Sequence, residues 1–177
     1  MFYNMDGFFA YLFNIIDPDD PFNRNNRRNQ KNTEGMAYNC AGYALNCFSW
    51  YCPVEQKDWE ENSEDYQWGS PSPVARNAMT FKFVSQILKD FPDVRVIESL
   101  SDIRINEYAF AFRVGVDDFH FVKRGDNGHW YEKRGDNPTI YQMSQKDVFN
   151  SDWGNGRYNG PIILMAKKKG VDNSPLM

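Results

Sequence analysis

The chain has 177 residues, of which 41% are hydrophobic and 16% aromatic, enough for one domain with a substantial core but too few for two full domains. Its net charge of -4 and its pI near 5.2 argue against nucleic acid or an anionic membrane as the main partner, because both require a basic face. Three cysteines are an odd number for a disulfide framework, so we expect a reducing compartment.

Residues 1–33 are predicted to be an aromatic N-terminal segment followed by a polar linker. The apolar stretch 7–16 is shorter than the roughly 20 residues that a bilayer span needs. A signal peptide is disfavoured because Asp6 precedes the stretch in place of basic residues, and Asp-Pro-Asp-Asp at 17–20 follows it in place of a small-residue cleavage site. We expect it to dock on the core as a helix or strand, with a partner-binding segment as the alternative. The sequence thus predicts a cytoplasmic protein without a membrane partner, and any release would need lysis or a dedicated secretion system.

Two helices are predicted in the first half of the remaining chain. The first covers residues 40–50, and a long loop is expected over residues 54–70. Ser72 followed by Pro73 is typical of a helix start, and apolar spacing continues from there to about Lys89.

The second half has the pattern of an antiparallel sheet. A short helix is expected from about Ser144, and five short extended segments are predicted at 94–97, 108–114, 119–123, 129–133 and 161–166. Helices first and strands afterwards predict an α+β fold. Residues 34–170 should form one domain, and residues 171–177 a flexible tail.

Cys40 is the best candidate for a reactive group. It stands at the expected first turn of a helix, directly after Asn39, a residue suited to cap that helix. Free backbone N–H groups and the helix dipole favour a thiolate there. Cys47 and Cys52 are interpreted as core or incidental residues. A zinc site built from the three cysteines and a histidine is disfavoured because no close chelating pair is present, so we expect neither a metal nor a cofactor.

A cysteine nucleophile needs a base, and the chain has two histidines. His120 lies in an alternating strand pattern that sends Phe119 and Phe121 to one face and His120 to the other. His129 follows a turn at an exposed hairpin end. His120 is therefore the better base, and a purely structural histidine is the alternative.

A third group is needed to orient the base, and Glu132 is the nearest candidate. The turn at residues 125–128 folds the next strand back beside His120. Ordinary pairing would place Arg124 opposite His129 and His120 opposite Lys133, whereas a one-residue bulge would place Glu132 opposite His120. Other polar residues that loops can bring close are the rivals Asp117, Asp118, Asp136 and Asn137.

These motifs resemble known families of cysteine hydrolases. Asn39-Cys40-Ala41-Gly42 is similar to the Asp-Cys-Ser-Gly signature of NlpC-type cell-wall peptidases, and Tyr43 and Ala44 fit the CHAP amidases. In the NlpC-type pattern the second polar residue follows the histidine by about twelve positions, which is Glu132 here, and CHAP members often use Glu. The resemblance implies a papain-like (NlpC/CHAP-like) core, with the catalytic cysteine at a helix N-terminus packed on the sheet that carries the histidine.

The oxyanion site is the part of the pattern that departs from the papain family, whose Gln is replaced by Glu34. The backbone N–H of Cys40 would stabilise the oxyanion, helped by the Asn39 amide or the Tyr38 hydroxyl. Trp59 and Trp68 are candidates for the wall of a substrate groove.

The predicted function is that of a cysteine peptidase or amidase that cleaves a peptide or isopeptide bond through a thioester, with Cys40, His120 and Glu132 as its catalytic residues. Acyl transfer and deamidation stay open, as does the oligomeric state. A protein or peptide is the expected substrate. The alternative is a non-enzymatic binding or inhibitor protein, phage- or virus-encoded, on the same fold.

Overall fold

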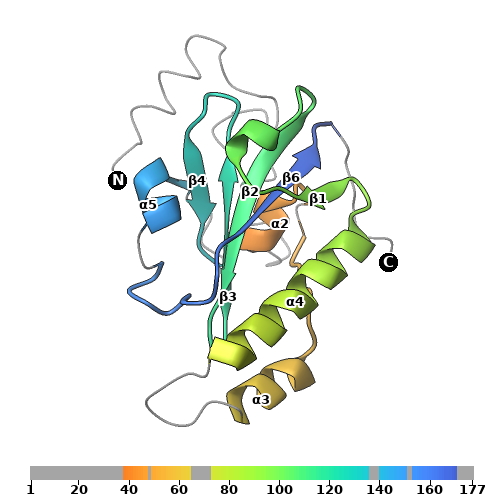
Figure 1. The fold of residues 1–177 in the computed structure, drawn as a ribbon, viewed down its shortest axis with the longest axis vertical. Coiled ribbons are helices and arrows are strands. Elements are labelled where there is room, and N and C mark those ends of the chain that lie inside the picture. Colours follow the sequence, from red (N-terminus) through yellow and green to blue (C-terminus); the bar gives the residue numbers. More distant parts are fainter. Residues whose placement is uncertain (1–37, 48, 65–72, 136–139, 151–152, 171–177) are drawn as a thin grey trace, which may run out of the picture.

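The computed structural model describes residues 38–47, 49–64, 73–135, 140–150 and 153–170, and its main element is a six-stranded antiparallel sheet (Figure 1). The strands lie in the order β1-β6-β2-β3-β4-β5. They are β1 Val94–Val96, β2 Glu107–Val114, β3 Phe119–Arg124, β4 Trp130–Lys133, β5 Ile140–Met143 and β6 Ile163–Lys168. The helices are α2 Cys40–Ala44, α3 Gln56–Glu64, α4 Pro73–Asp90, the 3-10 helix η2 Leu100–Asp102 and α5 Gln145–Asn150. The predicted α+β class is therefore confirmed.

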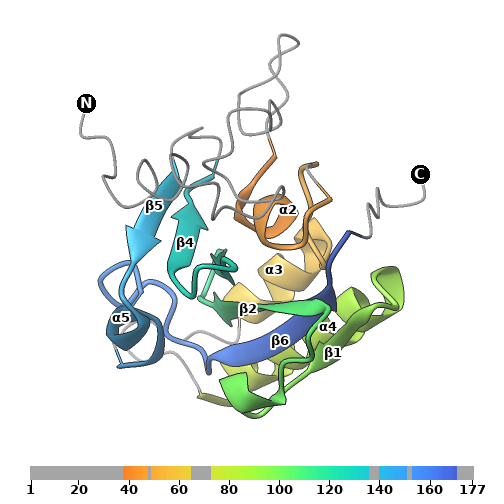
Figure 2. The same cartoon turned by 90° about the horizontal axis from the view of Figure 1, so that it is seen from above.

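The central strand β2 separates two hydrophobic cores because its side chains alternate between the two faces of the sheet. Phe110 and Phe112 belong to the core that includes residues of α2 and α4. Ala109 and Ala111 belong to the second core, which includes a residue of α5. Figure 1 shows α4 and α5 at opposite sides of the molecule, and Figure 2 gives the same arrangement from above.

Helix α4 confirms the prediction made from Ser72 and Pro73, since Pro73 is its first residue. Met79, Phe83 and Ile87 recur at four-residue spacing and are buried against the sheet. The short helix expected from Ser144 is also confirmed as α5.

Helix α3 contradicts the expected long loop over residues 54–70, of which residues 65–70 lie outside the described part. The Asp58 carboxylate stabilises the helix start by accepting a hydrogen bond from the Glu55 N–H at 2.9 Å. The same carboxylate forms an ion pair with Lys82 of α4 at 2.8 Å. Trp59 packs edge-on against Phe83. The contacts with Lys82 and Phe83 are tertiary, which explains why a stretch without apolar periodicity is helical.

Helix α2 is much shorter than the predicted 40–50. Asn46 has a positive φ of 54°, and its N–H bonds to the Tyr43 carbonyl while the Cys47 N–H bonds back to the Gly42 carbonyl. This is the Schellman ending, with Asn in the left-handed position that glycine usually takes. The expectation of a helix to residue 50 was wrong because Asn46 is a weaker stop signal in a sequence than glycine.

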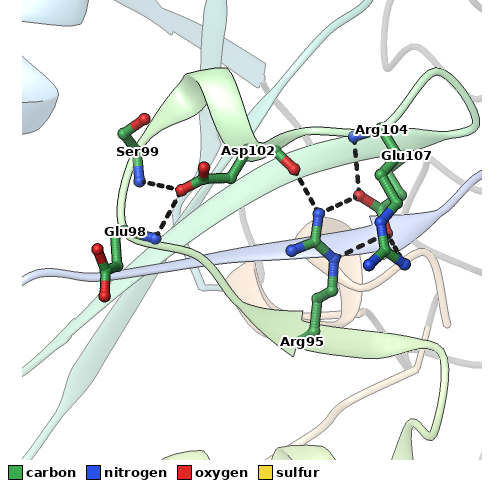
Figure 3. Close-up of polar contacts among 6 residues, drawn as sticks. All are labelled: Arg95, Glu98, Ser99, Asp102, Arg104 and Glu107. Carbon is green, nitrogen blue, oxygen red and sulfur yellow. Dashed lines mark hydrogen bonds and ion pairs between the residues drawn. The ribbon is translucent and has the colours of Figure 1, made fainter.

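The connection from β1 to β2 is held by a polar cluster drawn in Figure 3. The Arg95 guanidinium donates to both carboxylate oxygens of Glu107, at 3.0 and 2.7 Å. Asp102 accepts from the Ser99 backbone N–H at 2.9 Å, completing a capping box at η2. The cluster holds the β1 edge of the sheet, and none of its residues lines the cleft described below.

The remaining sequence predictions divide into three groups. The extended segments at 94–97, 108–114, 119–123, 129–133 and 161–166 are confirmed as β1, β2, β3, β4 and β6, with ends that differ by at most two residues. Strand β5 was missed. The expectations for residues 1–33 and 171–177 lie outside the described residues. Within the described parts of the chain, no helix has the length and apolar character needed to cross a membrane.

Candidate active site

The turn between β3 and β4 determines which side chains of the hairpin meet. The Gly125 N–H donates to the His129 carbonyl at 2.8 Å, and Gly128 has a φ of 82°. This is a three-residue loop with a left-handed glycine, and it pairs Arg124 with Trp130. The expected pairing of Arg124 with His129 was wrong by one residue.

That one-residue difference decides the face on which the functional groups lie, because a slip of one position moves every side chain to the other face. Val122 pairs with Glu132, so Glu132 shares a face with His120, two residues before Val122. The same register continued places Arg134 opposite His120, just after the end of β4. The expected bulge, which would have placed Glu132 opposite His120, is not present in this pairing. His120 and Glu132 are instead diagonal neighbours on one face of the sheet.

The contact between His120 and Glu132 is short and buried. His120 Nε2 lies 2.7 Å from Glu132 Oε2, and the two side chains are 8% and 9% exposed. The Phe119 and Phe121 side chains lie in the opposite core, as the strand pattern predicts. Because Nε2 is engaged by the carboxylate, Nδ1 is the ring nitrogen left for another partner.

Cys40 is the other neighbour of that ring. Asn39 caps α2 as predicted, with its Oδ1 accepting from the Gly42 N–H at 3.0 Å, and this places Cys40 at the first position of the helix. Helix α2 packs against β3, and Cys40 Sγ lies 4.0 Å from the Phe119 carbonyl oxygen. The Cys40 side chain is also among the groups that raise the pKa of His120.

The electrostatics of the site favour a protonated His120. Burial by itself lowers the pKa of His120, but hydrogen bonds and charge interactions with Cys40 and Glu132 raise it to about 9. For Glu132, burial by itself raises the pKa, and the opposing hydrogen bonds and charges of His120 and Arg134 bring it below the usual range of a glutamate. The pair is thus an imidazolium and a carboxylate at neutral pH.

A tight loop covers the His120 ring on a further side. The Tyr158 ring is stacked on His120 with 5.4 Å between centroids, and the Trp153 ring meets it edge-on at 6.1 Å. Asn155, at the tip of this loop, has a left-handed φ of 56°. These rings help to keep His120 only 6% exposed and restrict its rotation.

Cys40, His120 and Glu132 all line one cleft of about 1060 Å³. The cleft is lined by aromatic, acidic and basic side chains together with the predicted site: Asn39, Cys40, Trp50, Cys52, Gln56, Trp59, Glu60, Asp117, Asp118, Phe119, His120, Glu132, Arg134, Gly135, Met143, Asp147, Trp153, Gly154, Asn155, Arg157 and Tyr158. Trp59 therefore lies in a groove wall as expected, whereas Trp68 lies outside the described residues. The volume is that of a binding cleft for a molecule of substantial size.

The rivals of Glu132 are placed differently. Asp118 lines the cleft, but its carboxylate pairs with Arg157 at 3.1 Å and accepts from the Phe119 N–H at 2.7 Å and the Tyr158 hydroxyl at 3.2 Å. Asp117 also lines the cleft. The other two rivals, at positions 136 and 137, lie outside the described residues.

Of the two helpers proposed for the oxyanion, Asn39 lines the cleft and Tyr38 does not. Asn39 Nδ2 donates to the Tyr51 carbonyl at 2.7 Å, and its Oδ1 accepts from the Tyr51 N–H at 3.3 Å as well as from Gly42. Tyr38 packs with Tyr43 and other residues of a separate core, and its own carbonyl accepts from Lys133. The hydrogen bonds of Asn39 hold the chain around Cys40 in place.

The other cysteines and the second histidine are not part of the His120 contact. Cys47 is buried, which raises the pKa of its thiol, while the exposed Cys52 lies in the cleft wall. His129 is exposed and contacts Gln142 at 3.0 Å. No three His, Cys, Asp or Glu side chains among the described residues are grouped so that they could hold a metal ion.

The sequence alone assigned no role in the site to three residues that contact the His120 and Glu132 pair: Arg134, Trp153 and Tyr158. Arg134 had a usable signal, since it shares the even-numbered face with His120 and Glu132 in the correct register. Trp153 and Tyr158 reach His120 only through the tertiary fold. Comparisons with protein-family models, with curated proteins and with solved structures each gave no match.

Proposed function

We propose that this protein is a cysteine-nucleophile hydrolase that cleaves amide bonds through a thioester, with a papain-like arrangement of its active site. The observation that carries the proposal is the buried contact of His120 with Glu132 at a large cleft that Cys40 also lines. A nucleophile, a base and an orienting carboxylate in hydrogen-bonding contact are the parts that such chemistry needs.

In the proposed reaction, His120 already holds the proton of the Cys40 thiol as an imidazolium, and the thiolate sulfur attacks the carbonyl carbon of the substrate amide. The tetrahedral intermediate collapses when the C–N bond breaks and His120 donates its proton to the departing amine. Water then attacks the thioester, His120 accepts a proton from the water, and the sulfur leaves as the thiolate, which restores the starting state. Glu132 keeps the ring in place and stabilises its positive charge throughout.

Two further features support this assignment. The raised pKa of His120, about 9, keeps the ring protonated at neutral pH, so that it can donate a proton to the departing amine. The cleft also combines exposed Trp50 with Trp59 and charged side chains, which suits a polypeptide substrate better than a small apolar ligand. The backbone N–H of Cys40 is the proposed oxyanion donor.

The test is selective modification of Cys40, followed by mass spectrometry of the intact and digested protein. We expect iodoacetamide to react at Cys40 faster than at exposed Cys52 at pH 6, although simple exposure would give the reverse order. Cys40→Ala should abolish cleavage of a fluorogenic peptide library, whereas Cys47→Ala, in the core, should retain it.

Two results would contradict the proposal. One is equal alkylation of Cys40 and Cys52 at every pH, and the other is full cleavage activity in Cys40→Ala. A protein whose Cys40 reacts slowly, and which cleaves no member of the library, would instead fit the binding or inhibitor alternative.

A further inference from the structure

Arg134 contacts the one oxygen of Glu132 that His120 leaves open. Its Nε and Nη2 atoms both donate to Glu132 Oε1, at 3.1 and 2.7 Å, while Oε2 is held by His120 at 2.7 Å. The two carboxylate oxygens are thus divided between two cations. A buried carboxylate that lost one of these partners would keep an acceptor without its hydrogen bonds, which is costly in a site shielded from water.

The position of Arg134 follows from the sheet. Its register places it on the same face as His120 and Glu132, and Tyr141 of β5 pairs with Glu132 on the other side. The guanidinium lies over the Tyr141 ring, 4.7 Å from its centroid. The planar fork is therefore held by an aromatic face and a carboxylate together, which distinguishes it from an isolated surface ion pair.

We propose that Arg134 is a positioning residue of the active site, which holds the Glu132 carboxylate and through it the ring of His120. The inference rests on the proposed function. Arg134 touches neither Cys40 nor the reacting atoms in this scheme, and its effect passes through Glu132. The proposal adds Arg134 to the predicted catalytic residues Cys40, His120 and Glu132, all of which line the cleft.

The measurement is the rate of Cys40 alkylation by iodoacetamide in the full chain, followed from pH 4 to 9. Without Arg134 the Glu132 carboxylate takes up a proton at higher pH. It therefore stabilises the His120 imidazolium over a narrower pH range. In Arg134→Gln we expect the acid limb of the profile to move upward by about half a pH unit, the size that an accessible ion pair supports. Arg134→Lys keeps the cation and should stay close to the wild-type limb.

Arg157→Gln is the matched control. Arg157 also lines the cleft and its side chain is 56% exposed against 64% for Arg134, but it pairs with Asp118. The variant removes the same charge from the same cleft without touching Glu132, so its acid limb should not move. Tyr141→Leu leaves the guanidinium and removes the ring beneath it, and should shift the limb in the same direction as Arg134→Gln.

An unmoved limb in Arg134→Gln, or an equal shift in Arg157→Gln, overturns the role of Arg134. Thermal unfolding verifies that each variant is folded, and the milder Tyr141→Leu variant decides the matter if Arg134→Gln does not fold, because an unmoved limb there overturns the role of Arg134. The two proposals fail separately. If Cys40 of the wild type is not selectively alkylated, the proposed hydrolase is wrong, whereas selective alkylation with an unmoved limb refutes only the role of Arg134.

Discussion

Replacing Asn39 by Asp tests how the chain around Cys40 is held in place. Asp is the residue that the NlpC-type signature carries before its cysteine, and it is also a good helix cap. Its Oδ1 would retain the hydrogen bonds from the Gly42 N–H at 3.0 Å and the Tyr51 N–H at 3.3 Å. The substitution removes one hydrogen bond, because Asn39 Nδ2 donates to the Tyr51 carbonyl at 2.7 Å and the carboxylate oxygen that replaces it cannot donate.

The expected cost comes from that single contact. Asn39 is only 3% exposed, so losing the donor leaves two acceptors facing each other away from water, at a cost of about 1–3 kcal/mol. The negative charge at the start of α2 would recover only about 0.3–1 kcal/mol from the helix dipole. The loss therefore exceeds the gain, and we expect Asn39→Asp to lower the free energy of unfolding by about 1–2 kcal/mol.

Urea unfolding followed by tryptophan fluorescence gives this difference, and Asn127→Asp is the matched control. Asn127 Nδ2 donates to the Tyr131 hydroxyl at 2.6 Å, and a hydroxyl can rotate to donate instead. The control should be near wild type in stability. An Asn39→Asp variant as stable as the wild type, or two variants with equal losses, would refute the reasoning.

Two further predictions concern Gly42 and His120. A Cβ at Gly42 would lie 2.0 Å from the Ser49 carbonyl oxygen, so Gly42→Ala should destabilise the fold by at least about 1–3 kcal/mol in urea unfolding, and a loss below 0.5 kcal/mol would contradict the close approach. His120 has its pKa raised to about 9 in the folded protein, against roughly 6.5 unfolded, so its stabilising effect is fully present below pH 6.5 and is lost as the pH rises through 9. That shift corresponds to a loss of up to about 3 kcal/mol, measurable as a fall in the free energy of unfolding that His120→Gln should lack.

The sequence by itself determined the local elements with strong signals. Asn39 as a cap, Pro73 as the first residue of a helix and the alternating pattern around His120 all act within a few residues, so they could be recognised without a structure. For the same reason Cys40, His120 and Glu132 could be selected in advance as candidates, since only two histidines were available.

The tertiary structure decided how these elements meet. The register of β3 and β4 depended on one residue of loop length, and that residue placed His120 and Glu132 on a common face. Helix α3 and the Tyr158 stack on His120 depend on contacts with segments further along the chain, and β5 is a short edge strand that, among the described strands, pairs with β4 alone. Such features leave little periodicity in the chain. Local sequence patterns are enough to select the candidate side chains of the site. The distances among these side chains depend on strand pairing and packing over the described part of the domain.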